Sequence, residues 1–160
     1  MNYEGFNNDE WKFEKFVKVM ELKTRIVDGR EEIFDEFRGR YVEYTPEENV
    51  RQWFAHVLVD TYAYPRGRIG IEISLSIQRK IYRSDLIVFD KEGKPWMVVE
   101  CKSPEVNLTE KVFDQAVRYN HALKAVFIVL TNGKSTIVMK PDYNTGKIEF
   151  LSELPIYSAR

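Results

Sequence analysis

The stretch SDLIVFDKEGKPWMVVECK, residues 84–102, decides the fold of this chain. Two apolar runs, LIVF and WMVV, flank the turn-rich segment DKEGKP, and this pattern predicts a β-hairpin. If Phe89 pairs with Trp96 across the turn, the antiparallel register puts Asp85 opposite Glu100, on the same face of the sheet. The hairpin therefore predicts two neighbouring carboxylates at one end of a largely apolar sheet.

Such a pair of carboxylates has a catalytic and a structural explanation. Close carboxylates repel one another at a half-buried site unless a cation lies between them. Mg²⁺ binds one or two carboxylates, completes its coordination with waters and phosphate oxygens, and activates water for attack on phosphorus. Lys102 projects from the same face as Glu100, and it would orient or deprotonate that water or neutralise the transition state; a partly desolvated lysine can have its pKa lowered. The alternative is a solvated strand end with a cross-strand ion pair, which so short a motif does not exclude.

The segments around the hairpin predict an α/β fold. Residues 69–77 alternate strictly between apolar and small or polar side chains, which predicts a strand buried on one face. Strands over about 83–89 and 96–102 complete a three-strand antiparallel meander. A helix over 109–123 is followed by the uniformly apolar run 125–130, which is typical of a central strand covered on both faces. With two short final strands, TIVM and IEFL, the order predicts a mixed β-sheet flanked by helices.

The first third of the chain carries clear signals for one hairpin and one helix. Asp28-Gly29 lies between two strand-like runs and predicts a β-turn. Thr45 is placed to cap a helix with Pro46 at its first position, and this helix ends before Pro65 because the residue before a proline avoids helix. A charged and aromatic-rich start, with an expected helix over 9–22, precedes both.

Further side chains are candidates for the site, each with a structural alternative. Glu48 follows the cap by three residues, so its carboxylate is either the reciprocal acid of a capping box or a group that reaches a metal-bound water. Gln115 and Tyr119 lie four residues apart on one helix face, where they line the site or form an amphipathic boundary. Basic residues near the site in sequence either contact phosphates or belong to a solvated surface: Arg79, Lys80, Arg83, Lys111, Arg118 and Lys124.

The composition excludes several classes of protein. The chain has 160 residues, 44% of them hydrophobic and 31% charged, which is typical of one soluble globular domain. A net charge of −1 gives no overall attraction to nucleic acid, although it is compatible with local basic patches. A single cysteine, Cys101, excludes an intramolecular disulfide and a cysteine zinc site. The start lacks the features of a signal peptide, and no apolar run approaches the roughly 20 residues that span a bilayer, so we expect a cytoplasmic protein without membrane contact.

Together these residues resemble a known family. Asp85, the E-C-K triplet at 100–102 and Q-x-x-x-Y at 115–119 resemble the active site of the PD-(D/E)xK nuclease superfamily. Longer stretches resemble the N-terminal endonuclease domain of type I restriction enzyme R subunits: TPEENVRQ at 45–52, YAYP at 62–65, RSDLIVFD at 83–90, MVVECKSPEV at 97–106, FDQAVRYN at 113–120 and VLTNG at 129–133. Two more, IFDEFRGRYV at 33–42 and FLSELPIY at 150–157, resemble stand-alone forms of that domain.

The resemblance implies a restriction-endonuclease-like core that hydrolyses DNA phosphodiester bonds with Mg²⁺, for which Mn²⁺ is the expected substitute. In the family pattern Asp85 and Glu100 ligate the metal with help from the backbone carbonyl of Cys101, and Glu48 is an accessory acidic ligand. Lys102 assists the nucleophilic water. Ser84 stands where the superfamily has proline, and this departure is tolerated because the following aspartate does the chemistry.

The resemblance also implies that Gln115 and Tyr119 position the lysine, the acid or the DNA backbone, and Gln115 is counted with the catalytic residues. Of the basic residues near the site in sequence, Arg118 and Arg83 are expected to bind the substrate together with Tyr119. We expect a single domain over the whole chain, with an N-terminal extension at 1–30 and the nuclease domain at 31–157.

The expected partners follow from what the chain contains. DNA is the expected substrate, and separate motor or specificity proteins and a homodimer are compatible with the sequence. The chain has no glycine-rich phosphate loop of the GxxxxGK[ST] type, so no ATP site is expected. A second hypothesis is a catalytically silent nuclease fold that binds DNA or a partner protein.

Overall fold

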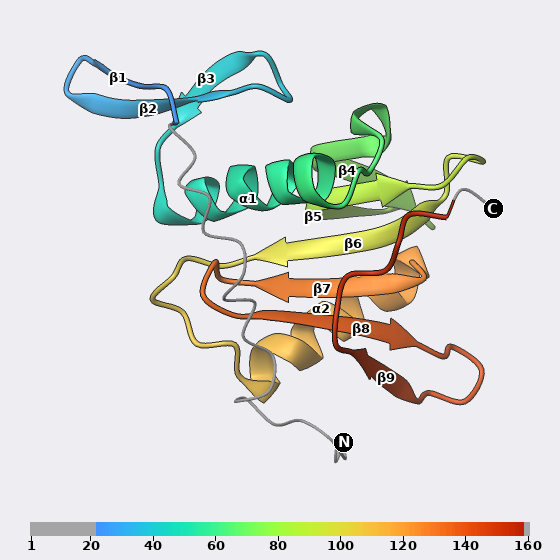
Figure 1. Ribbon diagram of the computed structural model, residues 1–160. Coiled ribbons are helices and arrows are strands. Elements are labelled where there is room, and N and C mark those ends of the chain that lie inside the picture. Colours follow the sequence, from blue (N-terminus) through green and yellow to red (C-terminus); the bar gives the residue numbers. More distant parts are fainter. Residues whose placement is uncertain (1–21, 159–160) are drawn as a thin grey trace.

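A computed structural model describes residues 22–158, in which a three-stranded sheet and a six-stranded mixed sheet combine with two α-helices (Figure 1). The six strands lie in the order β4-β5-β6-β7-β8-β9, with α1 on one face and α2 on the other. The bounds of these helices and strands are α1 (Pro46–His56), β4 (Ile69–Ile77), β5 (Lys80–Phe89), β6 (Pro95–Cys101), α2 (Glu110–Leu123), β7 (Phe127–Thr131), β8 (Thr136–Pro141) and β9 (Ile148–Leu151). The predicted α/β fold is confirmed. All but the last residue of the helix expected over 9–22 lie outside the described residues.

One parallel pair joins two antiparallel halves of the large sheet. β4, β5 and β6 form the predicted antiparallel meander, and β7, β8 and β9 form a second one. β6 and β7 run parallel, and α2 makes the crossover between them. Val129 of β7 packs beneath α1, whereas Ile128 and Leu130 pack against α2. β7 is therefore covered on both faces, as its uniformly apolar sequence predicted.

The β5–β6 hairpin keeps the predicted register along its length but not at its turn. A β-bulge makes Phe89 pair with Pro95, so the expected pairing of Phe89 with Trp96 is wrong. Past the bulge the expected register holds, with the pairs Val88–Met97, Ile87–Val98 and Leu86–Val99. Regular pairing ends at the last of these. The next positions on the two strands are Asp85 and Glu100, which are therefore neighbours at the end of the ladder.

The apolar side chains of β4 change from one face of the sheet to the other. Ile71 is buried beneath α1, whereas Ile73 packs with the C-terminal end of α2. Between them Glu72 adopts a left-handed φ of 48°, which interrupts the pairing with β5. A Cβ atom on Gly70 would lie 2.4 Å from Cγ1 of Ile73, so these two positions share a face. The prediction that the alternating residues of 69–77 are all buried on one face is therefore wrong, because the left-handed residue reverses the alternation.

Both helices begin where the sequence predicted. Thr45 Oγ1 accepts a hydrogen bond of 3.0 Å from the N–H of Glu48, and Pro46 is the first residue of α1. A short π-helical turn, Val57–Thr61, continues α1. α2 buries Phe113 in the core. Neither helix in the described part of the chain is long and apolar enough to cross a membrane.

The first three strands form a separate sheet, here called the arm (residues 24–43), which lies beside α1 (Figure 1). Its strands are antiparallel, and Asp28 (φ 50°) and Gly29 (φ 76°) form the predicted turn between the first two. The strands are β1 (Thr24–Val27), β2 (Arg30–Asp35) and β3 (Arg40–Glu43). The expected boundary between extension and domain falls at the first residue of β2, so the arm spans it.

The C-terminal segment returns across the α1 face of the sheet (Figure 1). Leu154 is buried there, and the hydroxyl of Tyr64 donates to the carbonyl of Pro155 at 2.5 Å. Tyr157 packs against Trp96 with ring centroids 5.1 Å apart. Because Trp96 lies at the start of β6, this aromatic packing closes the end of the sheet opposite Glu100.

Candidate active site

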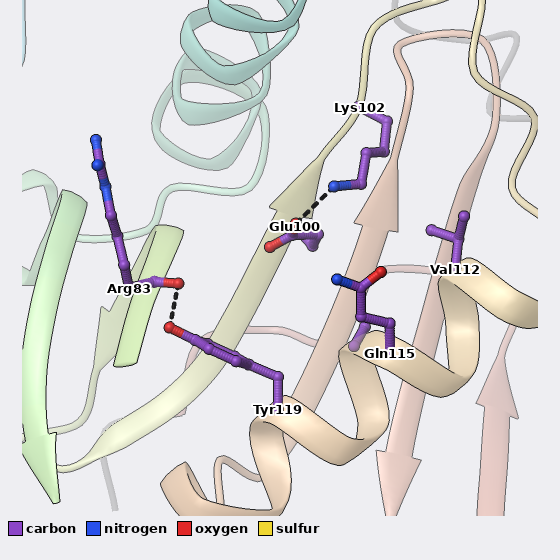
Figure 2. A pocket seen from close by; sticks show the side chains of 7 residues that line it. Arg83, Glu100, Lys102, Val112, Gln115 and Tyr119 are labelled. Carbon is purple, nitrogen blue, oxygen red and sulfur yellow. Dashed lines mark hydrogen bonds and ion pairs between the residues drawn. The ribbon is translucent and has the colours of Figure 1, made fainter. Parts of the chain in front are cut away.

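A cleft of about 220 Å³ lies at the carboxyl end of β6, between β5 and α2 (Figure 2). Val112 and Ala116 of α2 supply its apolar lining. Its polar lining comes from three elements: Arg83 of β5, Glu100 and Lys102 at the end of β6, and Gln115 and Tyr119 of α2. Five residues proposed from the sequence, far apart along the chain, thus line one cavity.

Glu100 and Lys102 form an ion pair in this cleft, with 2.8 Å between Lys102 Nζ and Glu100 Oε1 (Figure 2). The pKa of Glu100 is raised, first because burial disfavours its charged form and then because the charge of Asp85 is nearby; Lys102 offsets only part of this. Burial by itself would lower the pKa of Lys102, but the hydrogen bond and charge of Glu100 outweigh it and raise that pKa. The lowering that partial burial can cause is therefore more than offset here by the Glu100 carboxylate.

Asp85 is held from both sides by protein donors. Its Oδ1 accepts from Arg51 of α1, at 2.9 Å from Nη2 and 3.2 Å from Nε. Its Oδ2 accepts from the backbone N–H of Cys101 at 2.8 Å. A carboxylate has about four lone-pair positions, so these three bonds leave roughly one. Asp85 is therefore fixed in orientation at the end of the β5–β6 ladder and retains room for one further ligand.

Glu48 is the acid that holds Arg51 in place. Its carboxylate pairs with Nη1 of Arg51 and accepts from Arg38 Nη2 at 2.5 Å and from Gln52 Nε2 at 3.0 Å. The side chains of Glu48 and Arg51 are 6% and 7% exposed, so this pair lies out of water. The sequence left open whether this carboxylate completes a helix cap or reaches a metal. The structure gives it a third environment, between two arginines and a glutamine.

A further acid, Glu72 of β4, joins the same network. It accepts from Arg38 Nη1 and from Arg83 Nη2, each at 2.5 Å, and lies 3.9 Å from Arg51. Burial by itself would raise the pKa of Glu72, but the arginines outweigh it, led by Arg51, and the pKa is lowered. The register of β4 with β5 puts Glu72 beside Asp85. Glu72, Asp85 and Glu100 thus occupy one row across three neighbouring strands, here called the acid row.

Arg38 reaches this network from the arm. It lies in the turn between β2 and β3, where the buried Asp35 pairs with its Nε and also accepts from the N–H groups of Phe37 and Arg38. Burial by itself would lower the pKa of Arg38, but the surrounding acids raise it. The arm therefore supplies a charged group to the acids beneath α1.

The sequence did not identify three of these residues: Glu72, Arg51 and Arg38. Glu72 occupies a polar position in an alternating strand, a pattern typical of a solvent-facing side chain. The spacing of three between Glu48 and Arg51 is a helical ion-pair signal that could have been used. Arg38 and Glu72 are 34 positions apart in the chain, and no local pattern indicates their contact.

The remaining predicted residues lie around the cleft or below it. The Cys101 side chain is fully buried in the core beneath α1, as expected, and burial raises the pKa of its thiol. The hydroxyl of Tyr119 donates to the backbone carbonyl of Arg83 and so joins α2 to β5 (Figure 2). Arg118 lies outside the cleft, in an adjoining depression that also contains Lys111, Asp114, Gln115 and Tyr119.

The donor set suits a weakly chelated hard cation better than a complete protein cage. Within residues 22–158, no group of three or more His, Cys, Asp or Glu side chains is arranged to hold a metal ion. Asp85 and Glu100 are adjacent carboxylates, and burial together with the charge of Asp85 raises the pKa of Glu100. Two carboxylates with waters and phosphate oxygens are what Mg²⁺ prefers. The residues present therefore fit such an ion.

One family model matches more than half of this chain. Residues 46–155 match the family model described as type I restriction enzyme R protein N terminus. A solved structure of a fragment assigned as the HsdR subunit of a type I restriction enzyme from Vibrio vulnificus YJ016 matches with a TM-score of 0.44 and 22% sequence identity. That match covers 61% of this chain and 21% of that one, so the similarity spans about a fifth of the solved fragment. The search of curated proteins gave no match.

Proposed function

The chain belongs to the family of type I restriction enzyme R protein N termini, a restriction-endonuclease-like domain, and we propose that its cleft hydrolyses phosphodiester bonds of DNA with a divalent cation. One observation carries the proposal. Glu100 and Lys102 form an ion pair in a cleft lined by further polar side chains, and Asp85 lies beside Glu100 at the end of the β5–β6 ladder. A pure binding surface has no need of two adjacent acids facing an anionic polymer.

Asp85 and Glu100 are the groups that we propose to hold Mg²⁺, or Mn²⁺ in its place, with the carbonyl of Cys101 as a third ligand. Such a cation supplies an activated water and charge stabilisation at the phosphate. We assign Glu48, the predicted accessory ligand, to a different role, because its carboxylate already accepts from Arg38, Arg51 and Gln52. In this role Glu48 orients Arg51, which in turn fixes one oxygen of Asp85.

Lys102 is proposed to act as a charge rather than as a base. Its pKa is raised, so it enters the reaction as an ammonium that neutralises charge on the phosphate or orients the attacking water. We propose that Gln115 and Tyr119, which form the opposite wall, contact the substrate backbone together with Arg83, whose carbonyl Tyr119 binds (Figure 2). Arg118 extends this polar wall into the adjoining depression.

The direct test is cleavage of supercoiled and linear DNA in Mg²⁺ or Mn²⁺ by the wild type and by Lys102→Ala. We expect the variant to lose about 10²- to 10³-fold in rate, as when one group that stabilises transition-state charge is removed. Lys94→Ala is a matched control, because Lys94 also pairs with a nearby glutamate, Glu92, but lies in the β5–β6 turn at the other end of the hairpin. Equal cleavage by wild type and Lys102→Ala would contradict the mechanism.

A second candidate function is binding of DNA without hydrolysis, alone or beside separate motor and specificity proteins. The observation in its favour is that Arg51 already supplies positive charge to Asp85. Calorimetry with Mn²⁺ separates the two functions. A nuclease should show a Mn²⁺ site that Asp85→Ala abolishes, whereas a binding module should take up no Mn²⁺ in either protein.

A further inference from the structure

The arm contacts the rest of the protein at the turn between β2 and β3. The carbonyl of Glu36 accepts a hydrogen bond from Arg66 Nη2 at 2.5 Å, and the guanidinium of Arg66 lies 4.5 Å from the centre of the Phe37 ring. His56 of α1 packs edge-on against the same ring, with centroids 5.1 Å apart. Arg38 follows directly and reaches the acids beneath α1. The turn is therefore held by two kinds of contact, one outside the acid network and one inside it.

Arg38 uses each of its three guanidinium nitrogen atoms on a different acid. Nε pairs with Asp35 of β2, Nη1 with Glu72 of β4 at 2.5 Å, and Nη2 with Glu48 of α1 at 2.5 Å. The Arg38 side chain is 13% exposed, so these ion pairs lie largely out of water. A planar guanidinium presents donors in several directions at once, whereas an ammonium is a single point charge. Arg38 thus joins the arm, the large sheet and α1 in a way that lysine does not reproduce.

Several acids compete for Arg51, the arginine that holds Asp85. Among the described residues, four carboxylates lie within ion-pair distance of its guanidinium: Asp85 at 2.9 Å, Glu47 at 3.5 Å, Glu72 at 3.9 Å and Glu48 in direct contact. The bonds from Arg51 fix the orientation of the Asp85 carboxylate. If Glu48 and Glu72 had no other cation, their attraction would draw Arg51 away from Asp85.

Arg38 reduces this competition. It binds Oε1 of Glu48 and Oε2 of Glu72, whereas Arg51 faces the other oxygen of each acid. The Nη2 and Nε atoms of Arg51 then stay on Asp85. Three ion pairs in series therefore connect the arm to Asp85: Arg38–Glu48, Glu48–Arg51 and Arg51–Asp85.

We propose that Arg38 is a positioning residue for the metal site, which makes the arm part of the active site. The inference rests on the proposed function and deepens it, because it adds a residue outside the stretch 46–155 that matches the family model. Arg38 does not line the cleft, and it acts through Glu48 and Arg51 on the orientation of Asp85. Partners of metal ligands that act in this way contribute about 10- to 100-fold to metal affinity.

The experiment measures Mn²⁺ binding to the full chain by calorimetry, without DNA. The test variants are Arg38→Met and Arg38→Lys. The matched control is Arg66→Met, which also removes one positive charge and one contact to the β2–β3 turn, but from a side chain that binds a carbonyl and a ring and not an acid of the network.

A second measurement needs no metal. The backbone N–H of Cys101 donates to Asp85 Oδ2 at 2.8 Å, so its signal in a ¹H–¹⁵N NMR spectrum reports the position of that carboxylate. The spectrum is recorded for the same three variants and the wild type in EDTA.

Charge and position predict opposite signs for the change in Mn²⁺ affinity. Loss of a positive charge by itself strengthens cation binding, because one repulsion is removed. We expect Arg38→Met instead to weaken Mn²⁺ binding by about 10-fold and to shift the Cys101 signal, because Asp85 loses its fixed orientation. Arg38→Lys keeps the charge without the planar fork, so it should weaken binding several-fold and shift the same signal. Arg66→Met should change neither quantity.

Each other result overturns the inference. Unchanged or tighter Mn²⁺ binding by Arg38→Met, or wild-type affinity in Arg38→Lys, would show that Arg38 supplies charge and not position. Equal weakening by Arg66→Met would assign the effect to attachment of the arm as a whole. Since Arg38→Met leaves the buried Asp35 without its cation, Arg38→Lys carries the test if that variant does not fold.

Failure of the proposed function is recognised separately. A wild type without a Mn²⁺ site would contradict the metal site itself, whereas the Cys101 signal still tests whether Arg38 fixes Asp85. A Cys101 signal that stays in place in both Arg38 variants would overturn the positioning role, whatever the wild type binds.

Discussion

Glu72 and Glu100 lie on either side of Asp85 in the acid row, and the protein shifts their pKa values in opposite directions. Their side chains are similarly exposed, 25% and 30%, and burial pushes both pKa values upward. For Glu72 the arginines beneath α1 outweigh burial and lower the pKa. For Glu100 a single lysine is insufficient against burial and the charge of Asp85, and the pKa stays raised.

The difference teaches how one sheet end serves two purposes. On the α1 side each acid has an arginine partner: Arg38 and Arg51 lie among Glu48, Glu72 and Asp85. On the α2 side Glu100 has one lysine partner, Lys102, and this is the side that opens into the cleft. The locked side gives Asp85 a fixed orientation, and the open side is where a cation or a substrate phosphate changes the electrostatics most.

The largest expected effect comes from removing one basic side chain on each side of the acid row. Arg51→Met leaves the buried Glu48 and its neighbour Asp85 without their partner, so the free energy of unfolding should fall by about 3 kcal/mol, roughly 10 °C in Tm. Lys102→Met should cost only about 1 kcal/mol, because the Glu100 left behind reaches water in the cleft. Urea unfolding of both variants measures the two losses. Equal losses would remove the distinction between a locked and an open side.

The second prediction concerns β4, whose apolar side chains change from one face of the sheet to the other at Glu72. Gly70→Ala would bring a Cβ atom to 2.4 Å from Cγ1 of Ile73, so we expect a loss of about 1–3 kcal/mol. Adding Ile73→Ala removes the obstructing atoms, so the two changes should couple favourably by about 1 kcal/mol in a double-mutant cycle. Strict additivity would mean that Gly70 and Ile73 do not share a face.

The third prediction concerns the link that closes the cleft wall. Tyr119→Phe loses the hydrogen bond to the carbonyl of Arg83, at a cost of about 1 kcal/mol in unfolding free energy, and should also reduce the rate of DNA cleavage. Tyr157→Phe is the matched control, because the hydroxyl of Tyr157 donates to the carbonyl of Phe89 at 2.9 Å, away from the cleft. The control should lose similar stability and keep the wild-type rate. A lowered rate in both would contradict a specific role for Tyr119.

The smallest effect is a difference in the pH dependence of stability. Glu72 has a lowered pKa, so its ionised form stabilises the fold above the unfolded value of about 4.3, and this contribution is lost as pH falls through the folded pKa. Glu100 has a raised pKa, so its contribution is present below the unfolded value and is lost as pH rises through the folded pKa.

Replacement of each acid by glutamine should therefore give opposite trends. Relative to the wild type, Glu72→Gln should become more destabilising as pH increases from about 3 to 5, and Glu100→Gln less destabilising as pH increases above about 4.3. Urea midpoints between pH 3 and pH 8 report both trends. The same sign in both variants would mean that Asp85 and the arginines do not set the difference.

Local sequence was sufficient for most of the secondary structure. The caps at Thr45 and Pro46, the Asp28-Gly29 turn and the apolar run of β7 each gave the element that the structure contains. The register of the β5–β6 hairpin was also correct next to the site, although the bulge beside Phe89 was not foreseen. A bulge shifts pairing by one residue without changing composition, so no sequence pattern indicated it.

Electrostatic partners were the part that local sequence could not provide. Burial by itself would lower the pKa of Lys102, but the Glu100 carboxylate 2.8 Å away raises it. Glu72 was expected to be an outward-facing strand residue, since alternation assumes that the strand stays regular. Its left-handed backbone, and its pairing with an arginine of the arm, depend on packing between distant segments.

The sequence by itself determined the α/β architecture, the acid–acid–lysine end of the β5–β6 hairpin and the family to which the chain belongs, because periodicity, capping and short motifs are properties of neighbouring residues. Only the tertiary structure decided which acid pairs with the arginines beneath α1, namely Glu72, and which faces the cleft, namely Glu100. That outcome depends on where Arg38 and Arg51 come to lie, and charge interactions follow distance in space and exposure to water, which the order of residues along the chain does not specify.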